Sequence, residues 1–92
     1  MKNKIRLQIR FFGRVQGVGF RWTAKNLASL HGLTGWVLND WDGTVLMEIQ
    51  GEKSGIDSMI ERLDSDRFIE IERMEKESIP TVEYEREFKI KH

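Results

Sequence analysis

The chain has 92 residues, 39% of them hydrophobic, with 15 basic and 15 acidic side chains and no cysteine. This length suffices for one domain with one core, and a net charge of zero lacks the strongly basic balance typical of nucleic-acid-binding domains. The missing cysteines exclude disulfides, thiol catalysis and thiolate metal ligands. No apolar run approaches the roughly 18 residues of a membrane span. We therefore expect a single domain over residues 1–92, located in the cytoplasm, with no metal or other cofactor.

The charges are unevenly distributed along the chain. Residues 1–39 carry seven Lys and Arg and no carboxylate, a charge of +7, whereas residues 40–92 carry 8 basic and 15 acidic side chains, a charge of −7. Two interpretations stay open at this point. The two parts intermix in one fold and their charges average out, or the first part creates a local positive field that attracts a small anion.

Two elements are predicted in the first third of the chain. Residues 5–12 alternate between apolar and polar side chains, which predicts a strand with one buried face. Apolar residues at helical spacing then predict a helix over residues 20–31, and Gly32 is placed to end this helix in the C′ position. The helical phase puts Trp22 on the outer face of this helix.

The middle of the chain predicts a hairpin and a second helix. Residues 33–39 and 43–50 predict two strands, joined by a turn that contains an Asp-Gly pair. Ser54 and Asp57, three residues apart, resemble a capping box at the start of the second helix. The apolar stripe of that helix consists of Ile56, Met59, Ile60 and Leu63.

The last third predicts two further strands. They cover residues 68–78 and, after the interruption at Pro80, the alternating residues 82–90. The first six of these elements, in the order strand, helix, strand, strand, helix, strand, predict an α+β fold, a ferredoxin-like split β-α-β sandwich (βαββαβ) with an antiparallel four- to five-stranded sheet and two helices on one face. Enzymes, metabolite sensors and RNA-binding domains all use this fold, so the function must be argued from particular residues.

The strongest functional signal is the glycine-rich segment between the first strand and the first helix. Glycines allow backbone N–H groups to turn toward an anion, the following helix presents its positive end, and an arginine can hold two oxygens at once. The predicted anion-binding loop consists of Val15, Gln16, Gly17, Val18, Gly19, Phe20 and Arg21. In the competing interpretation, the glycines only form a tight turn and Arg21 pairs with a surface carboxylate.

Two segments together resemble the signature of the acylphosphatase family. They are Gly13-x-Val15-Gln16-Gly17-Val18-Gly19-Phe20-Arg21 and Gly35-Trp36-Val37-x-Asn39-x-x-x-Gly43-x-Val45. Two long matches in the same order within one short chain are far more specific than a lone glycine-rich loop. The resemblance covers essentially the whole chain and points to a free-standing small acylphosphatase, rather than to the similar domain at the start of larger hydrogenase-maturation proteins.

The resemblance implies metal-independent hydrolysis of the carboxyl-phosphate bond of an acyl phosphate, giving a carboxylate and inorganic phosphate. It implies that Arg21 and the loop hold the phosphate and that Asn39 orients the attacking water, although Asn39 taken alone is more simply a turn residue. It also implies that the substrate's own phosphate oxygen takes the proton, in a site without His, Asp or Glu. The expected partners are a small-molecule acyl phosphate and inorganic phosphate as product and inhibitor, with no nucleic acid, no membrane and a monomeric state.

The alternative function is a non-catalytic anion-binding or protein-interaction module on the same fold. Such a module is expected to lack Arg21 or Asn39, and both are present. An RNA-binding domain is disfavoured, because the strand over residues 44–50 has neither the aromatic nor the basic side chains that bind RNA.

Two groups of apolar side chains remain unassigned by these arguments. Trp22 and Trp41 are candidates to flank the mouth of the pocket, one or both, and to favour aromatic or bulky acyl groups; ordinary surface tryptophans are the equal alternative. The parity of the hairpin strands also predicts a patch on the open face of the sheet where a partner or a second copy could bind. This patch consists of Trp36, Leu38 and Leu46.

Overall fold

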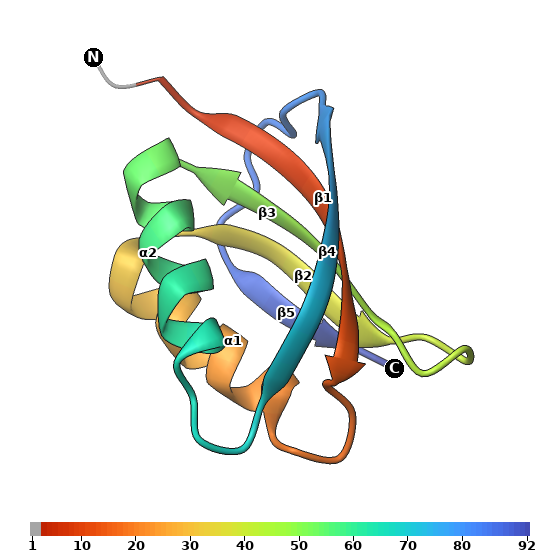
Figure 1. The fold of residues 1–92 in the computed structure, drawn as a ribbon. Helices are drawn as coiled ribbons and strands as arrows, with labels where there is room; N and C mark the ends of the chain where they lie inside the picture. Colours follow the sequence, from red (N-terminus) through yellow and green to blue (C-terminus); the bar gives the residue numbers. More distant parts are fainter. Residues whose placement is uncertain (1–2) are drawn as a thin grey trace.

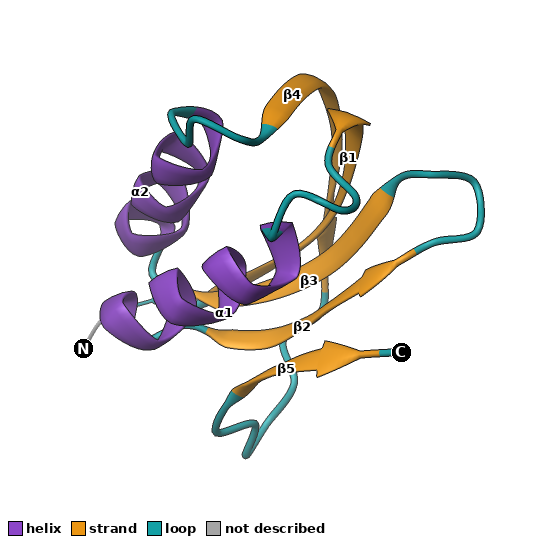
Figure 2. Cartoon of the chain, turned by 90° about the horizontal axis from the view of Figure 1, so that it is seen from below, coloured by secondary structure: helices purple, strands orange, loops and turns teal. Residues whose placement is uncertain are grey.

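A computed structural model describes residues 3–92 as one sheet covered by two helices (Figure 1). The elements in chain order are β1 (Ile5–Arg14), α1 (Phe20–His31), β2 (Thr34–Asn39), β3 (Val45–Gly51), α2 (Lys53–Asp64), β4 (Glu70–Ile79) and β5 (Phe88–Lys91). The strand order in the sheet is β4-β1-β3-β2-β5, and both helices lie on the same face (Figures 1 and 2). The predicted α+β sandwich is confirmed. Within residues 3–92, neither helix has the length and apolar character needed to cross a membrane.

The sheet is antiparallel except at one edge. β1 pairs with β3 and β4, and β2 with β3, all antiparallel, whereas β5 runs parallel to β2. The parallel register sets Val37 beside Ile90 and Leu38 beside Lys91. The residues that follow these pairs, Asn39 and His92, are therefore carried to the same end of the sheet.

The core lies between the sheet and the helices, as the alternation in the strands predicts. Phe11 of β1 and Phe20, the first residue of α1, are almost fully buried, and their ring centroids lie 4.9 Å apart. Burial of one such ring contributes about 2 kcal/mol to the free energy of folding. The start of α1 is thereby fixed against β1. The predicted stripe of α2 is also buried, and consists of Ile56, Met59, Ile60 and Leu63.

The last predicted strand is much shorter than the alternation of residues 82–90 suggested. Only Phe88–Lys91 is a strand, and Tyr84 has a φ of +66°, which takes the preceding segment out of the extended conformation. The Gln50 side chain binds this segment instead: its Nε2 donates to the Val82 carbonyl at 2.9 Å, and its Oε1 accepts from the Val82 N–H at 2.8 Å. An amide side chain thus takes the place of a neighbouring strand.

The capping box predicted at the second helix is wrong. α2 begins at Lys53 with Glu52 as the N-cap residue, so Ser54 lies inside the first turn. The Lys53 Nζ lies 2.8 Å from the Asp57 carboxylate, which engages Asp57 in an ion pair one turn along the helix. The other boundaries differ by a few residues, since β1 continues to Arg14 and β4 covers Glu70–Ile79.

The open face of the sheet carries the predicted apolar patch, although its three members are half-buried. Leu38 lies opposite Leu46 across β2 and β3. The Lys91 ammonium lies 4.4 Å from the centre of the Trp36 ring, a cation–π contact that partly covers this ring.

Candidate active site

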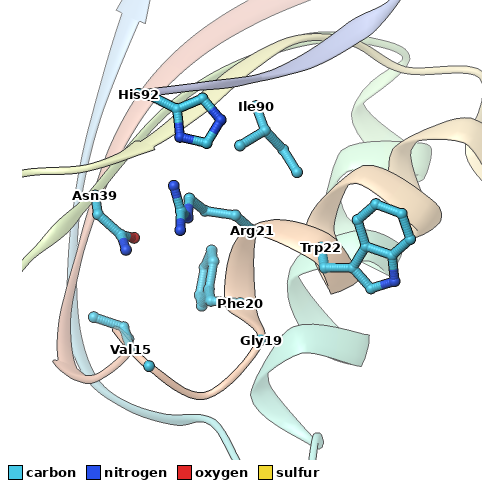
Figure 3. Close-up of a pocket in the computed structure, with 9 residues that line it drawn as sticks. Val15, Gly19, Phe20, Arg21, Trp22, Asn39, Ile90 and His92 are labelled. Atoms are coloured by element: carbon cyan, nitrogen blue, oxygen red, sulfur yellow. The ribbon is translucent and has the colours of Figure 1, made fainter.

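The loop after β1, the start of α1 and the ends of β2 and β5 meet around one pocket of about 320 Å³ (Figure 3). Its volume is at the lower end for small-molecule sites, so it suits one small ligand rather than a polymer. The residues that line it are Val15, Gly17, Gly19, Phe20, Arg21, Trp22, Asn39, Ile90 and His92.

The loop from Val15 to Gly19 contains two glycines in the left-handed backbone conformation. Gly17 and Gly19 have φ values of +74° and +81°, which residues with a Cβ adopt only at a cost. A Cβ built at either position meets no atom within 4 Å, so the backbone conformation, not crowding, calls for glycine here. Among residues 3–92, no group accepts a hydrogen bond from the backbone N–H of Gln16, Gly17, Val18 or Gly19. These donors are available to a ligand.

Arg21 lies in the first turn of α1, directly after the buried Phe20. Because Phe20 is locked against Phe11, the next side chain is directed into the pocket, where the guanidinium faces Asn39 (Figure 3). In the described part of the chain, Arg21 forms no ion pair and no hydrogen bond. The competing interpretation, in which Arg21 pairs with a surface carboxylate, is therefore not met among the described residues.

Asn39 ends β2, and its amide points toward Arg21 (Figure 3). Its Oδ1 is buried and has no hydrogen-bond partner among the described residues. Buried side-chain oxygens nearly always have such a partner, and the two ends of the amide can exchange places. The Asn39 amide therefore has hydrogen-bonding capacity left for a ligand or a water molecule.

The glycine-rich loop is tied to the hairpin that carries Asn39. The Gln16 Nε2 donates to the carbonyl oxygens of Asp40 at 2.7 Å and of Thr44 at 2.9 Å. The turn itself is held by Arg10, whose Nη1 donates to the Asp40 Oδ2 at 2.8 Å and to the Thr44 Oγ1 at 2.6 Å. The loop and Asn39 are thus positioned relative to each other by side chains that lie outside the pocket.

Hydrogen bonds within the turn also keep Asp42 charged. The Thr44 hydroxyl and backbone N–H donate to the Asp42 Oδ1 at 2.6 and 3.0 Å, and these bonds lower the pKa of that carboxyl. The charge faces Arg10 rather than the pocket, since the Arg10 Nη1 lies 3.7 Å from the Asp42 Oδ2. The nine described residues that line the pocket include Arg21 but no Asp or Glu side chain.

A search among known proteins identifies the family. The model of the acylphosphatase family matches residues 7–90. The chain belongs to the acylphosphatase family. It is 41% identical over 86 residues to an acylphosphatase from Clostridium acetobutylicum, which covers 92% of this chain and 94% of the relative. The family resemblance and the assignment as an enzyme are confirmed.

Solved acylphosphatase structures agree with this assignment. The crystal structure of acylphosphatase from Bacillus subtilis superposes with a TM-score of 0.87 at 29% identity, over 96% of this chain and 99% of that one. The crystal structure of full-length HypF in its phosphate- and nucleotide-bound form superposes with a TM-score of 0.88 at 30% identity. It covers 100% of this chain but only 12% of HypF, so the acylphosphatase fold also occurs within much longer proteins.

Most of the residues expected for an acylphosphatase site come together in the pocket. Arg21 and Asn39 line it, as do four of the other six loop residues. Gln16 and Val18 do not: the Gln16 side chain reaches the hairpin turn, and Val18 packs against the core. Their backbone N–H groups remain part of the loop, whereas their side chains hold the loop in place against the hairpin and the core.

Two residues of the site were missed by the sequence interpretation. Ile90 and His92 line the pocket because β5 runs parallel to β2, and the pocket therefore contains a histidine, contrary to the expectation of a site without one. The alternation of the last residues predicted a strand but not its neighbour or direction. Within residues 3–92, no group of three or more His, Asp and Glu side chains is arranged to hold a metal ion.

Proposed function

We propose that the chain hydrolyses the carboxyl-phosphate bond of a small acyl phosphate in this pocket, giving a carboxylate and inorganic phosphate. The observation that carries the proposal is that Arg21, which has no ionic partner in the described chain, faces Asn39, whose buried Oδ1 has no hydrogen-bond partner there. Both face a loop whose backbone donors are free of other described acceptors. This set suits a small tetrahedral anion and a water molecule beside it.

The phosphoryl group is held by the loop and by Arg21. Charge in phosphoryl transfer is spread over the equatorial oxygens, so catalysis requires positioned positive groups more than a strong nucleophile. Backbone N–H groups of residues 16–20 and the Arg21 guanidinium supply them. The same contacts bind inorganic phosphate, which makes this product an inhibitor.

The attacking water is oriented by Asn39. Its oxygen forms a bond to phosphorus while the bond from phosphorus to the acyl oxygen breaks, and the carboxylate leaves with the electron pair. The proton of the water passes to an oxygen of the substrate's own phosphoryl group. Among the nine described residues that line the pocket, His92 is the side chain of a type that commonly acts as a general base.

Hydrolysis of benzoyl phosphate, followed by ultraviolet absorbance in the presence of a chelator, tests the proposal. We expect turnover by the wild type, and a loss of about 10²- to 10³-fold in kcat/KM for Arg21→Ala and for Asn39→Ala. Both variants are checked for folding by circular dichroism. A folded wild type that binds inorganic phosphate but hydrolyses nothing would make the chain a binding module instead.

The variant His92→Ala tests the path of the proton. A general base contributes about 10²- to 10⁴-fold to the rate, so a kcat close to that of the wild type excludes His92 from this role. A loss of that size, with the acidic limb of the pH profile removed, would assign the proton to His92 and refute transfer to the substrate.

The remaining parts of the proposal concern the state of the molecule. We propose that it acts as a monomeric single domain in the cytoplasm and binds no nucleic acid. Sedimentation at two protein concentrations tests the monomer, because association through the patch of Trp36, Leu38 and Leu46 would raise the apparent mass with concentration.

A further inference from the structure

We propose that Trp22 and Ile90 form an apolar slot for the acyl group, so that this enzyme prefers acyl phosphates with flat aromatic or bulky apolar acyl groups over acetyl-sized ones. The inference rests on the proposed function, because it concerns the part of the substrate that leaves as the carboxylate. It assigns a specificity role to an exposed tryptophan on α1.

The polar side chains Arg21 and Asn39 and the exposed ring of Trp22 lie on different sides of the pocket. Arg21 and Asn39 face each other, whereas Trp22 of α1 lies on the other side of Arg21 from Asn39 (Figure 3). Ile90 of β5 lies above Arg21 in this view, between His92 and Trp22. An acyl phosphate with an apolar acyl group has the same division, a dianionic phosphoryl group joined directly to an apolar carbon group.

Trp22 is suited to bind such a group because most of its ring is available. Its side chain is 63% exposed although it borders the pocket, whereas Phe20 and Val15 in the same lining are buried. An aromatic ring that stacks on or meets the edge of an indole gains affinity beyond the area that it buries. An acetyl group has no ring and can form no such contact with the indole.

The alternative direction for the acyl group is a second depression of about 460 Å³ on the far side of Gly17. Arg14 and Arg67 line this depression together with one carboxylate, Glu70, so the two arginines could hold an acyl group that carries a second carboxylate. Asn39 and Arg21 line the pocket that contains Trp22, and neither is among the residues that line the depression at Arg14. The slot at Trp22 is therefore the direction that continues from the reacting atoms.

The chain offers a matched control in Trp41. It is also a surface tryptophan, 94% exposed, and lies in the hairpin turn two residues after Asn39. It is not among the described residues that line the pocket. Of the two tryptophans that the sequence offered as pocket residues, the geometry favours Trp22 alone.

The test compares kcat/KM for benzoyl, acetyl and succinyl phosphate in the wild type, Trp22→Ala, Trp22→Phe and Trp41→Ala. We expect the benzoyl-to-acetyl ratio to fall about tenfold in Trp22→Ala, mainly through KM, because a stacked aromatic contact is lost. Trp22→Phe should keep most of the ratio and Trp41→Ala all of it. Alanine is the best helix former at an exposed helical position, so the variant is expected to fold.

Two outcomes would overturn the inference. The first is an unchanged benzoyl-to-acetyl ratio in a folded Trp22→Ala, and the second is a wild type that prefers succinyl phosphate and loses this preference in Arg14→Ala. Hydrolysis of none of the three substrates would instead refute the proposed function.

A binding measurement keeps the inference testable even in that case. In the double variant Trp36→Phe/Trp41→Phe, Trp22 is the only tryptophan left. We expect benzylphosphonate to change its fluorescence at concentrations at least about tenfold lower than methylphosphonate. Equal concentration dependence for the two phosphonates would refute the apolar slot independently of catalysis.

Discussion

Two arginines of this chain, Arg6 and Arg21, show opposite arrangements of the same side chain. Arg6 is 2% exposed, and its guanidinium donates to Glu48 at 2.9 Å, to Glu85 at 2.8 Å and to Gln50 at 3.2 Å. Arg21 has no such partner among residues 3–92 and borders a pocket. The comparison teaches that a saturated arginine holds the fold together, whereas an unsaturated one at a concave site is available to a ligand.

The two arginines also differ in how their positive charges are compensated. Burial alone would lower the pKa of Arg6, but its hydrogen bonds to Glu85 and Glu48 raise that pKa above the ordinary value. Burial likewise would raise the pKa of Glu85, but the hydrogen bond from Arg6 lowers it below its ordinary value. The charges of this network compensate one another inside the molecule, whereas the charge of Arg21 awaits compensation from outside it.

The largest expected effect is at Arg21, where a substitution should lower activity without lowering stability. Replacement by alanine should lower kcat/KM by about 10²- to 10³-fold, because the developing charge on the phosphoryl oxygens loses its main counter-charge. The same change should leave the midpoint of thermal unfolding nearly unchanged, since no described group pairs with Arg21. Lys25→Ala, an equal change of charge one turn along α1, is the control. A large loss of stability in Arg21→Ala would contradict the comparison.

The opposite result is expected at Arg6, where a substitution should lower stability and leave the activity of the folded protein unchanged. Arg6→Met should lower the free energy of unfolding by about 3 kcal/mol, because it leaves two carboxylates at Glu48 and Glu85 without their partner. Urea unfolding measures this, and the folded fraction should keep its kcat. The exposed pair of Lys53 and Asp57 provides the control, since Lys53→Met should cost less than about 0.5 kcal/mol.

A smaller effect should link the two regions at Gln16. Gln16→Glu keeps the shape of the side chain but, when ionised, cannot donate to the carbonyls of Asp40 and Thr44. We expect a loss of about 1–2 kcal/mol in stability and about tenfold in kcat, because the loop is released from the hairpin that carries Asn39. A variant with wild-type kcat would show that this tie does not position the site.

The smallest effect concerns acid stability. Because the pKa of Glu85 is lowered in the folded state, its contribution is present above the ordinary glutamate pKa of about 4.3 and is lost as the pH falls through the folded value. Between pH 6 and pH 3 the wild type should therefore lose more stability than Glu85→Gln. We expect the difference to stay below about 1 kcal/mol, because solvent reaches and screens this pair. Equal losses in urea titrations at the two pH values would contradict it.

The sequence predicted the order of elements well because burial here follows simple periods. Alternation at Leu7, Ile9 and Phe11 and the helical stripe from Ile56 to Leu63 each match one buried face. It failed where a long-range contact overrides the pattern. Val82 lies in an alternating stretch, yet the side chain of Gln50 binds its backbone and no strand forms there.

The site was predictable only in its local part. The glycines and Arg21 lie within one continuous segment, so their chemistry could be deduced from spacing. Ile90 and His92 reach the pocket through the pairing of β5 with β2, about fifty residues away along the chain, which no local pattern encodes. Nor could helical phase alone show that Trp22, on the outer face of α1, still borders the pocket.

The edge position of β5 has a consequence for how activity is acquired. Residues 15–22 and Ile90 are far apart in the sequence, and contacts between such distant segments form slowly because a long loop must first be closed. A nascent chain on the ribosome could contain Arg21 and Asn39 and still have an open, incomplete site. Turnover would then begin only after β5 has been synthesised and has docked beside β2. The onset of activity would therefore report that the site has been completed.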